Sequence, residues 1–175
     1  MTCIELVQLA ADTLRALADG HLAAANRTAP VPLTPYLAGP DCRGVWEYRA
    51  GQVVEDPASA AWVTGIVWDP ERRIAVGRAG YHGPPDGTKM VEVGYSIDPQ
   101  YRRQGYARAA LLERAEREPG VTTVRATTSP GNVASRDLVL SHGFGEVGEQ
   151  MDEEDGLEIV YEVAVGSGVA SSDRR

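Results

Sequence analysis

The spacing of apolar positions changes along the chain, and these changes predict the order of its elements. Near the N-terminus, Leu14, Leu17 and Leu22 recur at intervals typical of one face of a helix. Around residues 60–98 the period becomes two, which predicts consecutive strands. We expect strands at 3–9, 60–69, 73–83, 90–98, 121–129, 145–151 and 157–165, and helices at 11–27, 42–57, 104–118 and 131–144.

This order predicts an α+β protein with a mixed sheet. An antiparallel meander leads into a strand–helix–strand unit, and a hairpin follows. We therefore expect a central sheet of about seven strands with helices on both faces. Residues 1–165 are predicted to form one domain, and the polar segment 166–175 has too little to bury and is predicted to be a disordered tail.

Composition narrows the classes of function. The net charge of −8 disfavours nucleic-acid binding, which relies on a basic surface. No stretch approaches the ~20 apolar residues of a membrane span, and the first residues do not resemble a secretory signal. Cys3 and Cys42 suggest neither a zinc site nor a disulfide framework. We expect a cytoplasmic protein without metal, nucleic-acid or membrane partners, as a monomer or homodimer.

The segment "YRRQGYA" (101–107) lies between a predicted strand and a predicted helix. Backbone amides at a helix start have no partners within the helix, and together with the helix dipole they attract anions. Gly105 allows close approach of an anion to the main chain, while Arg103 and Arg108 add forked cationic donors. The segment predicts a phosphate or pyrophosphate cradle; a solvated helix start is the structural alternative. A P-loop and a dinucleotide fingerprint are excluded because their lysine and glycine spacings are absent.

Two segments resemble a known family. Arg102-x-x-Gly105-x-Ala107 resembles the Gln/Arg-x-x-Gly-x-Gly/Ala motif of the GCN5-related N-acetyltransferase (GNAT) superfamily. Downstream, "SPGNVASRDLVLSHGF" is similar to the second half of that fold. The resemblance covers about Val91 to Phe144 and is nearest to the ribosomal-protein N-terminal acetyltransferase branch. It implies a GNAT-like fold with acetyl-coenzyme A as co-substrate.

The resemblance also implies cofactor-binding positions. Main-chain amides of the loop would bind the pyrophosphate, which assigns Arg103, Gln104, Gly105, Tyr106, Ala107 and Arg108. The preceding strand end would pair with the pantetheine arm, which assigns Tyr95, Ser96 and Ile97. The Ile97 amide is a candidate donor to the oxyanion of the transition state. Asn132 and Ser135 match positions that face the arm and the sulfur, and Arg102 is expected to support the loop.

The acid and base are predicted separately. Glu92 shares the polar face of strand 90–98 with Gly94 and Ser96, and a Glu in a half-buried strand needs a partner or a function. We expect it to be the general base, although a salt-bridged or edge-exposed Glu is the structural alternative. His82 and the acidic cluster 152–155 are weaker candidates.

One departure from the family pattern concerns the acid. Many members carry a tyrosine acid where this chain has Val139, so Ser135 is the expected acid, as proposed for the ribosomal-protein branch.

The resemblance implies direct attack of a primary amine on the thioester in a ternary complex, with a peptide N-terminus or a small-molecule amine as acceptor. Tyr36, Trp46 and Tyr48 lie in the region that, by resemblance, borders the acceptor site, although core packing explains them equally well. A non-catalytic acyl-coenzyme A sensor with the same fold is the alternative function. Nucleic-acid binding through the arginines is a third and disfavoured one.

Overall fold

The computed structural model describes residues 2–112, 115–153 and 155–165. The predicted tail at 166–175 lies outside them. The strands are β1 (Glu5–Val7), β2 (Gly65–Asp69), β3 (Ile74–Tyr81), β4 (Met90–Ile97), β5 (Thr123–Thr128), β6 (Gly145–Asp152) and β7 (Gly156–Ala164). The α-helices are α1 (Ala11–Ala18), α2 (Leu22–Thr28), α3 (Pro40–Glu55), α4 (Tyr106–Leu112) and α5 (Val133–Ser141). Short 3-10 turns cover Pro57–Ala61, Pro99–Tyr101 and Ala115–Arg117.

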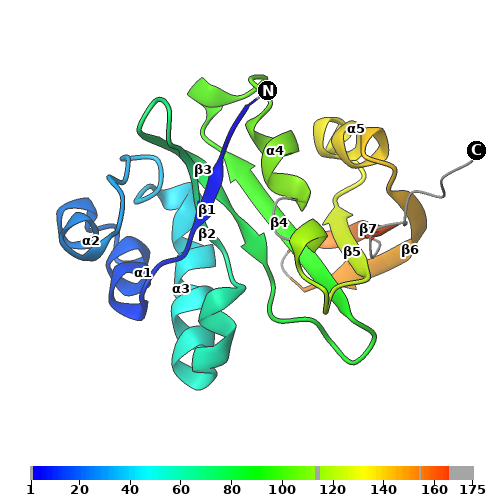
Figure 1. Ribbon diagram of the computed structural model, residues 1–175, viewed down its shortest axis with the longest axis horizontal. Coiled ribbons are helices and arrows are strands. Elements are labelled where there is room, and N and C mark those ends of the chain that lie inside the picture. Colours follow the sequence, from blue (N-terminus) through cyan, green and yellow to red (C-terminus); the bar gives the residue numbers. More distant parts are fainter. Residues whose placement is uncertain (1, 113–114, 154, 166–175) are drawn as a thin grey trace, which may run out of the picture. The chain divides into compact units, whose positions relative to one another are not determined.

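The strands form one seven-stranded sheet in the order β1-β2-β3-β4-β5-β7-β6 (Figure 1). Neighbours β1 to β4 pair antiparallel, as do β5 with β7 and β6 with β7. The predicted α+β class and the seven-stranded mixed sheet are confirmed. No helix in the described part of the chain is long and apolar enough to cross a bilayer.

The chain divides into two compact units. The first contains the described residues up to Pro84 and those from Val93 to Leu112. The second contains Pro85–Glu92 and the described residues after Leu112.

Both faces of the sheet are covered in the first unit. On one face, Leu14 and Leu17 of α1 and Trp46 of α3 are fully buried in a cluster that includes Ile66 of β2. On the other face, a second cluster joins Tyr106 and Ala110 of α4 to apolar side chains of β2, β3 and β4. Strand β2 is buried along its whole length, so neither of its faces is solvated.

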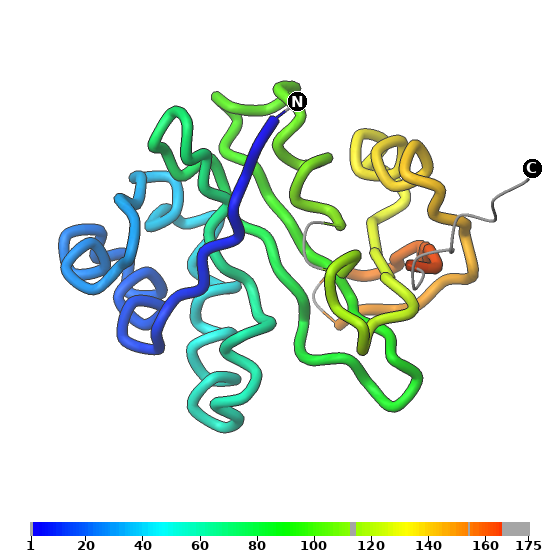
Figure 2. Tube along the Cα trace, viewed as in Figure 1, coloured from blue at the N-terminus to red at the C-terminus, as the bar shows by residue number. Residues whose placement is uncertain are grey.

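The predicted helix 11–27 is two helices, and the break has a local cause. Helix α1 ends at Ala18, Gly20 adopts a φ of 72°, and α2 starts at Leu22. A left-handed residue cannot continue a right-handed helix, and glycine adopts this conformation at little cost. The trace in Figure 2 follows the chain through this turn into α2 and on to α3. The prediction of helical structure in residues 11–27 is therefore confirmed for each of the two helices, but the prediction of one continuous helix is wrong.

In the second unit, β5, β7 and β6 form an antiparallel sheet. Val124 and Ala126 of β5, Val139 of α5 and Tyr161 of β7 are buried in this unit. Helix α5 ends at Ser141, earlier than the predicted 144, because Gly143 follows it with a φ of 81°.

Candidate functional site

The connection from β4 to α4 is tied down by side chains before the helix begins. The Asp98 carboxylate accepts a hydrogen bond from the Gln100 amide at 3.0 Å and so starts the short 3-10 turn. Arg102 Nε donates to the Ile97 carbonyl at 2.9 Å. The Arg102 side chain therefore turns back onto the strand end, which matches its expected role in loop structure.

The turn that follows has an unusual backbone. Arg103 and Gly105 have φ values of 61° and 88°, and the first helical bond runs from the Ala109 amide to the Gly105 carbonyl at 2.9 Å. Within the described ranges, none of the amides from Arg103 to Arg108 donates a hydrogen bond to another residue. When successive residues alternate between left-handed and right-handed backbone conformations, their amides converge on a concavity that binds anions. The residues present therefore fit a pyrophosphate held by the main chain.

Helix α4 begins at Tyr106, two residues later than predicted, because of the positive φ at Gly105. The predicted helix also ran on to 118; the chain instead shows a 3-10 turn at Ala115–Arg117, and residues 113–114 lie outside the described ranges.

Tyr106 and Gln104 anchor the loop to the turn between β2 and β3. The Tyr106 hydroxyl donates to Asp69 Oδ2 at 2.6 Å and accepts from Arg72 Nη1 at 3.0 Å. The same Arg72 nitrogen donates to Gln104 Oε1 at 3.1 Å, and Thr2 donates to the Gln104 carbonyl at 3.0 Å. Both side chains are thus occupied in holding the loop, which leaves only their amides for the predicted anion contacts.

This anchor shifts two acidities. Burial raises the pKa of Tyr106, and its hydrogen bond to the Asp69 carboxylate adds to the rise. Burial alone would raise the pKa of Asp69, but hydrogen bonds from the Tyr106 hydroxyl and from the amides of Arg72 and Glu71 outweigh burial and lower it. Asp69 is therefore the ionised acceptor and Tyr106 the neutral donor.

At the end of β4, before the loop, successive backbone amides point alternately to the two sides of the strand. The Asp98 amide donates to the Val76 carbonyl of β3 at 3.0 Å. Successive amides of an antiparallel strand point in opposite directions, so the Ile97 amide points away from β3. Ser96 is paired in register with Arg78, and its hydroxyl lies 2.7 Å from the Tyr36 hydroxyl. Tyr95 is half-buried.

Glu92 belongs to the second unit. It is half-buried, and the Thr127 hydroxyl of β5 donates to its carboxylate at 3.1 Å. The polar partner that a Glu in such a strand requires is therefore present.

Asn132 and Ser135 are joined at the start of α5. The Asn132 side chain caps the helix by accepting from the Ser135 amide at 3.1 Å. Asn132 is exposed, Ser135 is half-buried, and Val139 is buried in the core of the unit.

The weaker candidates for the base have structural partners. The main-chain carbonyl of His82 accepts a hydrogen bond from the Gln52 side chain at 2.6 Å. The His82 ring lies 3.3 Å from where a Cβ on Gly94 would stand. In the acidic cluster, Asp152 accepts from the Asp155 amide at 2.9 Å within the turn between β6 and β7; residue 154 lies outside the described ranges. Across the residues that the structure describes, no three His, Cys, Asp or Glu side chains are grouped to hold a metal ion.

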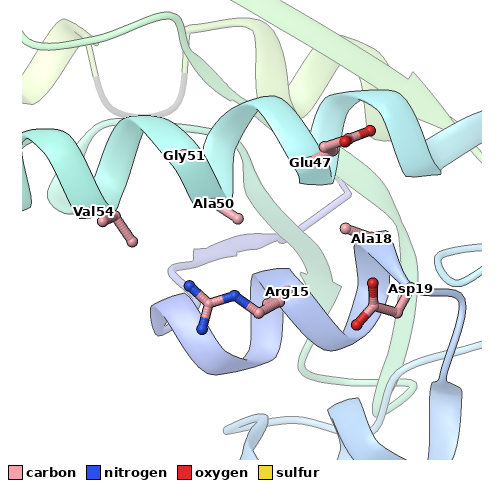
Figure 3. A pocket seen from close by; sticks show the side chains of 7 residues that line it. All are labelled: Arg15, Ala18, Asp19, Glu47, Ala50, Gly51 and Val54. Carbon is pink, nitrogen blue, oxygen red and sulfur yellow. The ribbon is translucent and has the colours of Figure 1, made fainter.

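A cavity of about 410 Å³ lies between α1 and α3 in the first unit (Figure 3). Arg15 of α1 and Asp19 directly after it line one side, and Glu47, Ala50 and Val54 line the cavity from α3. No predicted site residue lines this cavity.

The sequence missed four side chains that support or adjoin these positions. Asp69 and Arg72 lie in "DPER", which predicted only a turn, and Thr127 lies in an ordinary alternating strand. Arg78 was also missed, although an arginine within an apolar strand indicates that its guanidinium needs a hydrogen-bonding or charged partner.

Comparison with known proteins agrees with this geometry. The family model described as an acetyltransferase (GNAT) domain matches residues 10–145. The chain therefore belongs to the GNAT acetyltransferase family.

Individual relatives are distant. YoaA, an uncharacterized N-acetyltransferase of Bacillus subtilis, is 30% identical over 90 residues, which cover 48% of this chain and 51% of the relative. The chain thus spans about half the length of the curated relative that it matches.

Solved structures share the fold at low identity. A spermidine N-acetyltransferase (SpeG) chimera from Vibrio cholerae and hSSAT is 17% identical, has a TM-score of 0.61, and matches 92% of this chain and 95% of its own. RimL, a ribosomal alpha-N-protein acetyltransferase in complex with coenzyme A, is 14% identical, has a TM-score of 0.60, and matches 94% and 96%. The expected GNAT-like fold is thereby confirmed, and its structural neighbours include a ribosomal-protein acetyltransferase.

Proposed function

We propose that this protein transfers an acetyl group from acetyl-coenzyme A to a primary amine. The observation that carries the proposal is the run of amides from Arg103 to Arg108 that have no hydrogen-bond partner among the described residues, in a turn with left-handed Arg103 and Gly105. Membership of the acetyltransferase family supports acetyl transfer. The coenzyme A complex of RimL supports the identity of the donor.

The loop would bind the pyrophosphate mainly through its main chain. The amides of Gln104, Gly105, Tyr106 and Ala107 are proposed donors, and the exposed guanidinium groups of Arg103 and Arg108 would add charge. The proposed pantetheine-binding positions are Tyr95, Ser96, Ile97 and Asn132.

Acetyl-coenzyme A would supply an activated acetyl thioester. We propose that the Ile97 amide, which points away from β3, donates to the oxyanion that develops on the acetyl carbonyl. Glu92 is the proposed base: it would take a proton from the acceptor's ammonium group so that the neutral amine can attack, and the Thr127 hydroxyl would hold the Glu92 carboxylate in place. Ser135 is the proposed acid. A thiolate leaving group needs little acid help, since the pKa of a free thiol is about 8.5.

The proposal extends to the whole chain. The family model spans residues of both compact units, which supports one acetyltransferase domain over 1–165. The acceptor is proposed to be a peptide N-terminus or a small-molecule amine, the classes on which RimL and SpeG act by name. We propose a cytoplasmic enzyme that works as a monomer or homodimer.

The experiment measures release of coenzyme A thiol from acetyl-coenzyme A with a panel of primary amines. Glu92→Gln should reduce turnover sharply and leave coenzyme A binding, measured by calorimetry, unchanged. Glu149→Gln, which alters an exposed Glu of β6, is the matched control and should behave as the original protein. If coenzyme A binds tightly but no amine releases thiol, the protein is the acyl-coenzyme A sensor instead.

A further inference from the structure

Arg78 holds an unusual position in the first unit. It lies on β3, in the middle of three strands, paired in register with Ile66 of β2 and Ser96 of β4. Ile66 belongs to the apolar cluster formed with α1 and α3, so this is the face of the sheet that those helices cover (Figure 1). The Arg78 side chain is half-buried there.

The guanidinium of Arg78 is incompletely paired. Its Nε is buried and has no hydrogen-bond partner within the part of the chain that the structure describes. Buried donors in native proteins are nearly always satisfied, and a buried unpaired cationic donor is more costly than a neutral one. A ligand that brings an acceptor oxygen to Nε would remove this cost.

The neighbours of Arg78 favour an anionic group. The Ser96 and Tyr36 hydroxyls lie 2.7 Å apart beside it; one of them donates to the other, and the remaining hydroxyl proton can be donated to an oxygen. Burial raises the pKa of Tyr36, so the phenol remains a donor at neutral pH. Two residues before Ser96, Gly94 contributes no side chain; apart from its chain neighbours, the His82 ring is the one described side chain within 4 Å of where a Cβ on Gly94 would stand. Ser96 and Tyr36 therefore offer a hydroxyl donor beside Arg78, and Gly94 adds no side chain to the same face of β4.

We propose that Arg78, flanked by Ser96 and Tyr36, binds a carboxylate of the acceptor, so that the acceptor is an amino acid or another amine that carries its own carboxylate. This inference rests on the proposed acetyltransferase function. A guanidinium matches a carboxylate through two parallel N–H donors, which a single carbonyl oxygen cannot use as well. A polyamine carries only positive charge, and Arg78 repels it.

The test compares matched acceptors with the full-length protein. Glycine and β-alanine are assayed against glycinamide and β-alaninamide, with spermidine as the polycation, and kcat/KM is measured by thiol release at saturating acetyl-coenzyme A. The original protein should prefer the carboxylates. Arg78→Gln should lower kcat/KM for the carboxylates by roughly 10- to 100-fold, the loss expected for a charged hydrogen bond, and leave the amides unchanged.

Two further variants complete the design. Arg27→Gln removes an exposed arginine of α2 and should change neither class of acceptor. Arg78→Lys keeps the positive charge but lacks the paired N–H donors of the guanidinium, so it should retain part of the preference for carboxylate acceptors. This variant also tests the proposal if Arg78→Gln does not fold. Equal loss for carboxylates and amides, or a preference of the original protein for spermidine, would overturn the inference.

Failure of the proposed function is separable from failure of this inference. If no amine releases thiol, calorimetric titration of β-alanine into the protein saturated with coenzyme A still applies. Binding that disappears in Arg78→Gln and persists in Arg27→Gln supports the carboxylate subsite, and binding that is equal in both variants refutes it.

Discussion

Replacing Gly105 by alanine tests the shape of the loop with a single added methyl group. Gly105 has a φ of 88°, a conformation that costs an L-residue about 1–2 kcal/mol. Its Cβ would stand 3.0 Å from Thr2 Oγ1, a contact that a small rotation of the threonine relieves. The backbone strain is therefore the main expected effect.

The loop can respond to this backbone strain in two ways. If the loop keeps its shape, the free energy of unfolding falls by about 1–2 kcal/mol. If the loop relaxes instead, the amides no longer converge and the affinity for coenzyme A falls by a similar free energy, which is about 5- to 30-fold. Because the relaxed loop escapes the strain, we expect weaker coenzyme A binding with only part of the stability loss.

Gly143→Ala is the matched control. Gly143 has a φ of 81° at the end of α5, and no heavy atom lies within 4 Å of its would-be Cβ. The assays are calorimetric titration with coenzyme A and urea unfolding of both variants. Gly143→Ala should lose stability and keep its affinity; an unchanged affinity in Gly105→Ala, or an equal loss in both variants, would refute the reasoning.

Three further changes test the supports of the loop. Tyr106→Phe removes the hydrogen bonds to Asp69 and Arg72 and should lower the free energy of unfolding by about 1.5–3 kcal/mol in urea, because both partners are charged; a change below about 0.5 kcal/mol contradicts this role. The folded-state pKa of Asp69 is lowered, so its contribution to stability is present above the unfolded pKa of about 3.9 and is lost as pH falls through the folded pKa. Urea midpoints between pH 7 and pH 3 should therefore fall less in Asp69→Asn than in the original protein, and parallel curves would disprove the linkage. Arg102→Gln should weaken coenzyme A binding without altering the pH profile, since it frees the Ile97 carbonyl; unchanged calorimetric affinity would show that Arg102 is dispensable.

Much of the fold follows from the apolar pattern. The seven strands are confirmed in their predicted order along the chain, because a period of two or of 3.6 reflects which side chains meet the core. Two of the errors in helix bounds lie at glycines. Gly20 splits the first helix and Gly105 delays α4, and in both cases one left-handed residue overrides favourable apolar spacing.

The supports of the loop were not predictable in the same way. Tyr106 and Asp69 are 37 residues apart, and no local pattern indicates that a tyrosine beside a glycine turn reaches back to a turn between earlier strands. Thr127 likewise meets Glu92 from 35 residues away. Motif spacing indicates which backbone binds the ligand, whereas side-chain partners of this kind appear only once the strands are in register.

The most direct test of the acetyltransferase proposal is a paired measurement on one purified sample: thiol release from acetyl-coenzyme A and mass spectrometry of the amine. The proposal predicts that thiol release depends on the amine and that one acetylated amine forms for each coenzyme A released. Tight binding of coenzyme A without any acetylated product, across amino acids, peptides and polyamines, would contradict it.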